Sequence, residues 1–378
     1  MIGQSPGLDV VLVHDWLVGV RGAERVLDRF ARTYGPTDLY ALVHDGRPLT
    51  PAIDACHFHV SPLQRLPGAA GRLRRWYLPV IPRMIERLRI RSCDLVLSDS
   101  SSVAKSIRPP EGVPHLCYCH SPARYIWEQT EDYATGSMGR LRVAGLRTVR
   151  RRFQDWDRRT ASRVDRFLAN SQHIAQRIER CWDREATVVY PPVRTSLFTP
   201  DSAVDREDWF LVVGALEPYK RTDLAIEAAV QGGHHLKVVG TGTQLESLQR
   251  SAPPGIEFLG RVPDEELIAL YRRARALIFP QEEDFGIVAV EAQACGCPII
   301  ALARGGALEI VRDDTGLFVE DQRAEAFDAA MNESTRWSIS STSCRTNAER
   351  FSCEVFDQAI ALEVATLVDA AMPATEVS

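Results

Sequence analysis

Short apolar runs alternate with segments of helical periodicity throughout the second half of the chain. The runs are rich in valine, isoleucine and leucine, which is typical of parallel strands covered by helices on both faces. The pattern predicts strands at 209–213, 236–239, 256–259, 276–279, 298–301 and 317–319. Between them it predicts helices at 222–230, 243–250, 264–274, 287–295, 306–312 and 322–332. This alternation indicates a doubly wound α/β domain.

The first half repeats the alternation less regularly. It predicts strands at 10–14, 39–43, 95–97, 115–119, 166–169 and 187–190, and helices at 22–33, 72–91, 140–163 and 172–181. Gly22, at the start of the first helix, suits a tight turn from strand to helix. After the serine-rich segment 334–344, the apolar spacing of 354–372 predicts one more helix.

The two halves meet in a proline-rich and polar segment. Tyr190-Pro191-Pro192-Val193 closes the first half, and we read residues 192–207 as the linker. A length of 378 residues with 45% hydrophobic composition fits two domains. We expect Rossmann-like domains at 1–195 and 196–353 facing a central cleft, and a helix at 354–378 that can cross back onto the first domain.

The start of the chain and its cysteines indicate a cytoplasmic protein. No basic leader precedes the first apolar run, which becomes polar at His14 and Asp15, so neither a signal peptide nor a membrane span is expected. The close cysteine pairs, at 117/119 and 295/297, have one intervening residue instead of the two typical of zinc or redox motifs. We expect reduced, mostly buried thiols and no metal site.

Charge is distributed unevenly along the chain. Residues 1–195 hold 30 Lys+Arg and 20 Asp+Glu, whereas residues 196–378 hold 15 and 30. The densest basic stretch lies at 72–91, between Arg72 and Arg91. It suits peripheral contact with an anionic membrane or a lipid phosphate, or it is simply a solvated helical face. No nucleic-acid partner is expected.

The most informative segment follows the predicted strand at 276–279 and runs from Phe279 to Gly296. Ligands of open α/β sheets bind at the carboxyl ends of strands, and Gly286 lets the backbone approach a ligand there. The amides that open the next helix then form an anion site. Lys220 follows another strand end and can add a full positive charge, so a nucleotide diphosphate is a suitable ligand.

Glu283 and Glu291 are eight residues apart, one in the loop and one in the predicted helix. Because carboxylates only accept hydrogen bonds, they suit the donating hydroxyls of a sugar and a ribose. Two separate hydroxyl-binding roles fit this spacing better than a general acid and base pair.

These residues resemble retaining glycosyltransferase family 4, whose hallmark is a Glu-x7-Glu motif. Here the motif is Glu283 to Glu291 within EEDFGIVAVEAQACGCPIIA. The resemblance extends through VHDWLVGVRGAERVL, CYCHSPARYIW, FLANSQHIAQRI, VVYPPV, LEPYKRTDLAIEA, FLGRVPDEEL and GGALEIV. It is closest to bacterial mannosyltransferases of surface-polysaccharide synthesis, and it implies the GT-B fold and a metal-independent reaction. The expected donor is GDP-mannose, with UDP and ADP sugars as the alternatives.

The resemblance also implies roles for individual residues. The donor sugar would be held by His120, Glu283 and the amides of Phe285, Gly286 and Ile287, the ribose by Glu291, and the diphosphate by Lys220. Backbone near Gly240, Gly242 and Val262 would read the base. The acceptor would be a glycan or a saccharide linked to polyprenyl diphosphate, docked on the first domain.

Two positions depart from the family pattern. Ala215 stands where relatives usually have a second diphosphate-binding arginine, a role that Arg221 can take over. Arg21-Gly22 stands where relatives tend to have paired glycines at the loop that faces the acceptor and the leaving phosphates.

Other functions fit the sequence less well. Asp155-Trp156-Asp157 matches the Asp-x-Asp metal motif of the other glycosyltransferase fold, but it lies inside a predicted helix, where residues two apart point in different directions. A hydride-transfer enzyme would need a third glycine after Gly240-Thr241-Gly242, where Leu245 stands. A sugar-nucleotide epimerase of the same fold and an inactive scaffold homologue remain alternatives.

Overall fold

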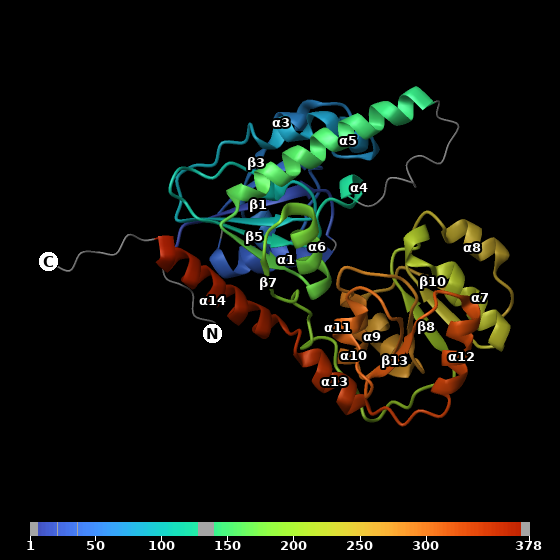
Figure 1. The fold of residues 1–378 in the computed structure, drawn as a ribbon. Helices are drawn as coiled ribbons and strands as arrows, with labels where there is room; N and C mark the ends of the chain where they lie inside the picture. The colour runs from blue at the N-terminus through green and yellow to red at the C-terminus, as the bar shows by residue number, and fades with distance from the viewer. Residues whose placement is uncertain (1–6, 21, 36, 128–139, 372–378) are drawn as a thin grey trace. The chain divides into compact units, whose positions relative to one another are not determined.

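The computed structural model describes residues 7–20, 22–35, 37–127 and 140–371, except for the side chains at 72, 74–76 and 140–149. The chain forms two compact units (Figure 1). Unit 1 comprises Met1–Tyr190 and Asp357–Ser378, and unit 2 comprises Pro191–Phe356. Each unit has its own parallel β-sheet with helices packed against it.

The sheet of unit 1 has the strand order β3-β2-β1-β4-β5-β6-β7, and every neighbouring pair is parallel. Its strands are β1 Val10–Leu17, β2 Asp38–His44, β3 His57–Val60, β4 Leu95–Ser100, β5 His115–Cys119, β6 Arg166–Ala169 and β7 Ala186–Val188. The helices are α1 Gly22–Tyr34, α2 Pro51–Asp54, α3 Ile81–Ile85, α4 Arg124–Trp127, α5 Arg140–Thr160 and α6 Gln172–Trp182, with most of α14 Cys353–Ala371.

The sheet of unit 2 has the order β10-β9-β8-β11-β12-β13 and is also parallel throughout. Its strands are β8 Phe210–Val213, β9 Leu236–Val239, β10 Ile256–Gly260, β11 Leu277–Phe279, β12 Ile299–Leu302 and β13 Gly316–Val319. The helices are α7 Thr222–Gly232, α8 Leu245–Ser251, α9 Asp264–Arg273, α10 Ile287–Ala294, α11 Ala307–Ile310, α12 Ala324–Ser334 and α13 Ser341–Glu349.

The prediction of two doubly wound Rossmann-like α/β units is confirmed. All six strands and six helices predicted for the second half are present, within a few residues of their predicted ends. The central strands are buried along their length because helices cover both faces of each sheet. In unit 1, α3 and α5 lie side by side over one face (Figure 1), where Ile81, Ile85, Phe153 and Trp156 join Val11 and Val96 in one core cluster.

The predicted helix at 72–91 is wrong. Residues Arg72–Val80 form a 3₁₀ segment that contains Pro79, and a short α-helix then covers only Ile81–Ile85. Pro79 and Pro82 lack the amide hydrogens that a continuous α-helix needs, so the α-helix begins only at Ile81. The side chains at 72 and 74–76 lie outside the described ones, so this part of the predicted basic face is not placed.

The sequence prediction missed the one-turn helices α2 and α4, edge strand β3 and helix α13. Edge strand β3 has the sequence HFHV and is mostly exposed, so it lacks the apolar run that marks the other strands. Helix α13 lies in polar sequence and is capped by Ser340, whose side chain accepts a hydrogen bond from the amide of Ser343. That serine cap starts a helix without an apolar signal.

The predicted carboxyl-terminal helix is present as α14. Ile360, Val364 and Leu367 are buried at helical spacing. Within unit 1, Asp357 pairs with Arg29 of α1, and Glu363 pairs with Arg166 of β6 at 2.8 Å. These contacts hold the helix in unit 1, although it follows unit 2 in the chain.

A fully buried ion pair and two tryptophan donors join four parts of unit 1: the turn Ala104–Ser106, α4, α5 and α6. Lys105 Nζ lies 3.0 Å from Asp157 Oδ1, and neither side chain is exposed to solvent. The other carboxylate oxygen of Asp157 accepts hydrogen bonds from Trp127 Nε1 at 2.9 Å and Trp182 Nε1 at 2.7 Å. Asp157, the second carboxylate of the Asp-x-Asp sequence, therefore has a structural role in this position.

All nine cysteines are free, and eight of them are buried, as predicted. Burial raises the pKa of several of these thiols, to about 12 for Cys117 and Cys295. Within the described ranges, no helix combines the length and hydrophobicity needed to cross a bilayer.

Replacing Lys105 by Met should destabilise unit 1 by about 3 kcal/mol, because it leaves the Asp157 carboxylate buried without its counter-ion. Denaturant unfolding followed by tryptophan fluorescence measures this loss. The control Arg32→Met breaks the exposed pair between Arg32 and Asp28 of α1, at 2.7 Å, and should change stability little. Equal shifts for the two variants would contradict a stabilising buried pair.

Candidate functional site

Each sheet has one point at which the strand order reverses. In unit 2 the chain adds β9 and β10 on one side of β8, and then β11, β12 and β13 on the other side. In unit 1 the equivalent point lies between β1 and β4. Loops that leave the carboxyl ends of the two strands at such a point run in opposite directions, which leaves room for a ligand. These two strand edges are therefore the candidate sites.

At the reversal point of unit 2, Lys220 and Glu283 contact each other. Lys220 ends the 3₁₀ turn Pro218–Lys220 after β8, and Glu283 follows β11. Lys220 Nζ donates to Glu283 Oε1, and Gln281 Nε2 donates to the same oxygen at 3.3 Å. The Lys220 and Glu283 side chains are 19% and 17% exposed. The structure thus brings together the cation and the carboxylate that the sequence assigns to one ligand.

Gly286 carries the chain from Glu283 into α10. Its φ of 112° lies in the left-handed region, and a Cβ there would lie 2.9 Å from the Phe279 ring. Gly286 gives α10 no side-chain cap, so the amides of the first turn, beginning at Ile287, depend on other partners. Phe285 is buried against Phe351, with ring centroids 5.4 Å apart. Glu291 lies on α10 and is only 3% exposed.

A second loop supports the backbone of Glu283. Gly305, after β12, forms a parallel bridge with Glu283, and the amide of Gly306 donates to the Glu283 carbonyl at 2.9 Å. A Cβ at Gly305 would lie 2.4 Å from that carbonyl oxygen. The neighbouring Arg304 is exposed. Paired glycines after a predicted strand, in GGALEIV, are a usable sequence signal for this support, but the local pattern alone assigns them no role.

Gly240 and Gly242 allow the loops after β8 and β9 to approach closely. A Cβ at Gly240 would lie 1.8 Å from the carbonyl oxygen of Gly214, and one at Gly242 would lie 2.3 Å from that of Leu216. Val262 is half-buried in the loop after β10. All three predicted base-reading positions therefore lie at the carboxyl edge of unit 2.

The structure describes most of the residues at the two departures from the family pattern, Ala215 with Arg221 and Arg21-Gly22. Ala215 is exposed in the loop after β8. Arg221 has a left-handed φ of 52°, and its guanidinium pairs with Asp223 at 3.2 Å, so a ligand would compete with this contact. Gly22 begins α1 at an exposed position, whereas Arg21 lies outside the described residues.

At the reversal point of unit 1, one buried carboxylate lies between two histidines. Asp99 of β4 accepts from His120 Nε2 at 2.6 Å through Oδ1. Its Oδ2 lies 2.9 Å from His14 Nδ1 of β1. His14 Nε2 lies 3.7 Å from Glu24 of α1. Of this cluster only His120 was predicted, because contacts between residues 85 positions apart, such as His14 and Asp99, give no local signal.

This cluster carries charge in a buried environment. Burial opposes ionisation of His14, but hydrogen bonds to Asp99 and Glu24 outweigh it and raise the His14 pKa from 6.5 to about 10. Burial also opposes ionisation of Asp99, yet His120 and His14 together lower its pKa. The stability that protonated His14 contributes is complete below pH 6.5 and is lost as the pH rises towards 10.

Asp15, next to His14, fixes the loop that follows β4. Its carboxylate accepts from the amides of Ser101 and Val103 at 2.6 Å and of Ala104 at 2.8 Å. Burial raises the Asp15 pKa despite these hydrogen bonds. Because the loop begins directly after β4, these bonds also fix the end of the strand that carries Asp99.

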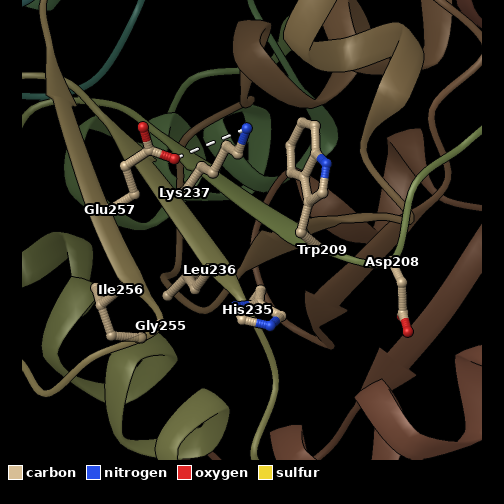
Figure 2. Close-up of a pocket in the computed structure, with 8 residues that line it drawn as sticks. All are labelled: Asp208, Trp209, His235, Leu236, Lys237, Gly255, Ile256 and Glu257. Atoms are coloured by element: carbon tan, nitrogen blue, oxygen red, sulfur yellow. Dashed lines mark ion pairs between the residues drawn. The ribbon is translucent and has the colours of Figure 1, made fainter.

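A separate hollow of about 400 Å³ lies at the opposite end of the unit 2 sheet. Asp208, Trp209, His235 and Gly255, which line it, immediately precede β8, β9 and β10 (Figure 2). Lys237 lies 4.3 Å from the Trp209 ring and 3.7 Å from Glu257, so its charge is already compensated. None of the predicted donor-binding residues lines this hollow.

In the described part of the chain, no group of three or more His, Cys, Asp and Glu side chains is arranged to hold a metal ion.

Two family models match the sequence. Residues 195–351 match the model described as Glycosyl transferases group 1, and residues 20–197 match Glycosyltransferase Family 4. The D-inositol 3-phosphate glycosyltransferase of Geodermatophilus obscurus is 34% identical over 232 residues, which cover 52% of this chain and 52% of that protein. The one from Mycobacteroides abscessus is 30% identical over 202 residues, 47% of this chain and 46% of that protein. The chain spans about half the length of these curated relatives.

Solved structures match over nearly the whole chain. Sucrose-phosphate synthase from Thermosynechococcus elongatus has a TM-score of 0.72 at 16% identity, covering 96% of this chain and 100% of that one. Anabaena HepE in complex with UDP-glucose has a TM-score of 0.67 at 18% identity, covering 95% and 100%. These likenesses show the fold.

Proposed function

Both units are similar in sequence to glycosyltransferases and together have the GT-B fold, and from this we propose that the protein is a retaining glycosyltransferase. It transfers a hexose, mannose from GDP-mannose, to a hydroxyl of a glycan or lipid-linked saccharide. The reaction needs no metal ion.

The observation that carries this proposal is the pairing of Lys220 with Glu283 at the reversal point of unit 2. An ammonium group beside the amino end of α10 suits the diphosphate of a donor. The Glu283 carboxylate accepts hydrogen bonds and suits sugar hydroxyls. Glu291 on α10 is then the ribose ligand, and backbone at Gly240, Gly242 and Val262 contacts the base.

The proposed reaction is a front-face substitution. The bond between the anomeric carbon and the diphosphate oxygen breaks, and the acceptor hydroxyl oxygen bonds to the same face of the sugar. The acceptor's proton passes to the leaving phosphate, so the configuration is retained. Lys220 and the α10 amides stabilise the charge that develops on the diphosphate, while His120 and Glu283 orient the sugar.

The donor has two candidates. The segments that resemble bacterial mannosyltransferases favour GDP-mannose. A UDP-sugar is the second candidate, since HepE was crystallised with UDP and UDP-glucose. A sugar-nucleotide epimerase and an inactive scaffold share the fold and would also bind nucleotides, so turnover has to be measured beside binding.

GDP and GDP-mannose should raise the unfolding temperature of the full chain more than UDP, UDP-glucose or ADP-glucose. A ligand at 100 times its dissociation constant stabilises the bound state by about 2.7 kcal/mol. Differential scanning fluorimetry with equal concentrations measures this. A larger shift with UDP-glucose would overturn the mannose assignment. Incubation with the preferred donor alone would show an epimerase by its converted sugar.

Glu283→Gln should lower sugar transfer about 100-fold or more, because one preorganised contact to the reacting sugar is lost. Transfer is measured with the preferred donor and a lipid-linked saccharide extract as acceptor. The matched control is Glu282→Gln, one residue away and exposed, which should retain activity within threefold. If the two variants have equal activity, Glu283 does not hold the sugar. Loss of wild-type activity with EDTA would separately contradict the metal-independent reaction.

The acceptor is proposed to reach unit 1 from an anionic membrane. Arg83, Arg87 and Arg89 are exposed and form no ion pair within the described part of the chain. Arg91, in contrast, pairs with Asp9 and Asp38 and is not available to a lipid phosphate. Each basic group near an anionic membrane surface contributes about 1 kcal/mol to binding.

The full chain should therefore co-sediment with vesicles containing 30% phosphatidylglycerol at low salt, and less at 0.5 M salt. Replacing Arg83, Arg87 and Arg89 together by Gln should weaken sedimentation at least tenfold. The control replaces three exposed arginines of unit 2, Arg250, Arg323 and Arg336, by Gln. Equal binding by both triple variants would show that this segment is not the contact.

A further inference from the structure

The carboxylate of Asp99 determines which nitrogen of His120 carries a proton. Asp99 is buried, and its pKa is lowered by its two histidine neighbours, so at neutral pH it only accepts hydrogen bonds. His120 Nε2, 2.6 Å from Asp99 Oδ1, must therefore be the donor. In a neutral imidazole the other nitrogen, Nδ1, is then unprotonated.

Nδ1 of His120 is available to accept a hydrogen bond from a ligand. Within the described residues, no hydrogen bond is formed by this nitrogen, and the side chain is 13% exposed. The imidazole is held by the Asp99 contact, by its backbone bond from the His120 amide to Ser100 at 2.8 Å, and by the edge of Tyr118, 5.2 Å between ring centroids. A single acceptor is thus presented in a fixed orientation.

His14 compensates the charge that this arrangement buries. Its imidazole is 2% exposed and lies between Asp99 and Glu24, the nearest carboxylates that face it from β4 and α1. Without a cation there, a buried carboxylate would take up a proton and cease to be a pure acceptor. Asp15, the other acidic neighbour on β1, is engaged by the three backbone amides of the loop after β4.

We propose that Asp99 is a positioning residue that fixes His120 as the Nε2–H tautomer, so that Nδ1 accepts a hydrogen bond from a hydroxyl of the transferred sugar. His14 supports it by keeping Asp99 ionised. The part about the sugar rests on the proposed function. The part about the tautomer stands on the geometry of unit 1 alone.

The test is ¹⁵N–¹H correlation of the imidazole rings in full-length protein labelled with [¹⁵N]histidine, at pH 7.5. His120 is assigned by the signal lost in His120→Gln. We expect the proton on Nε2 and an unprotonated Nδ1 in the wild type. In Asp99→Asn, the His120 proton should no longer be confined to Nε2. The same variant should lower kcat about 10- to 100-fold, the size usual when a residue that orients an active group is replaced.

Asp38→Asn is the matched control. It removes the carboxylate from another histidine of unit 1, His59, at 2.6 Å, and should leave both kcat and the His120 spectrum unchanged. A wild-type His120 protonated on Nδ1, or a folded Asp99→Asn with normal kcat, would overturn the proposal. The wild-type spectrum decides the tautomer even if Asp99→Asn does not fold. If the chain transfers no sugar while the spectrum is as expected, the proposed function has failed and the tautomer assignment stands.

Discussion

Parallel pairing of the two strands at each reversal point is the constraint on which both candidate sites depend. Since β8 and β11 run in the same direction, the loops that carry Lys220 and Glu283 leave the sheet at one edge. Residues 63 positions apart in the chain can then share a hydrogen bond. The same constraint, applied to β1 and β4, brings His14 to Asp99. An antiparallel pair would send the two loops to opposite edges.

Unit 1 keeps charged groups in its interior where packing alone would favour apolar ones. Lys105 with Asp157, and His14 with Asp99, are both nearly or fully buried. Such pairs are stabilising only if every remaining polar atom has a partner, which Asp157 achieves with two tryptophan N–H donors. The Lys105 pair connects α5 to the turn Ala104–Ser106, and the Trp182 hydrogen bond to Asp157 connects α5 to α6. The Asp99 cluster, at the carboxyl edge, fixes a side chain that faces a proposed ligand.

Much of the fold could be predicted from the sequence because its strands are continuous apolar runs. The motif from Phe279 to Gly296 also placed a turn and helix at a strand end, as found. The hydrophobic pattern failed to predict the helices where single groups determine their ends. Examples are the prolines at 79 and 82, and the serine cap of α13. The pattern could not find Asp99 or Gly305, because their partners lie in distant strands and loops.

Because unit 2 has a net negative charge, anion binding there depends on the positions of the nearest cations. Residues 196–378 hold 30 acidic and 15 basic side chains, so the average field repels a diphosphate. Exposed charges beyond about 8 Å are largely screened at physiological salt, and the nearest cations then dominate. Lys220 is paired with Glu283 before any ligand binds. A diphosphate that takes Lys220 as its partner leaves the Glu283 carboxylate free to accept from sugar hydroxyls. Because Ala215 supplies no charge, the proposed diphosphate would depend more strongly on Lys220 than in a site with cations at both positions.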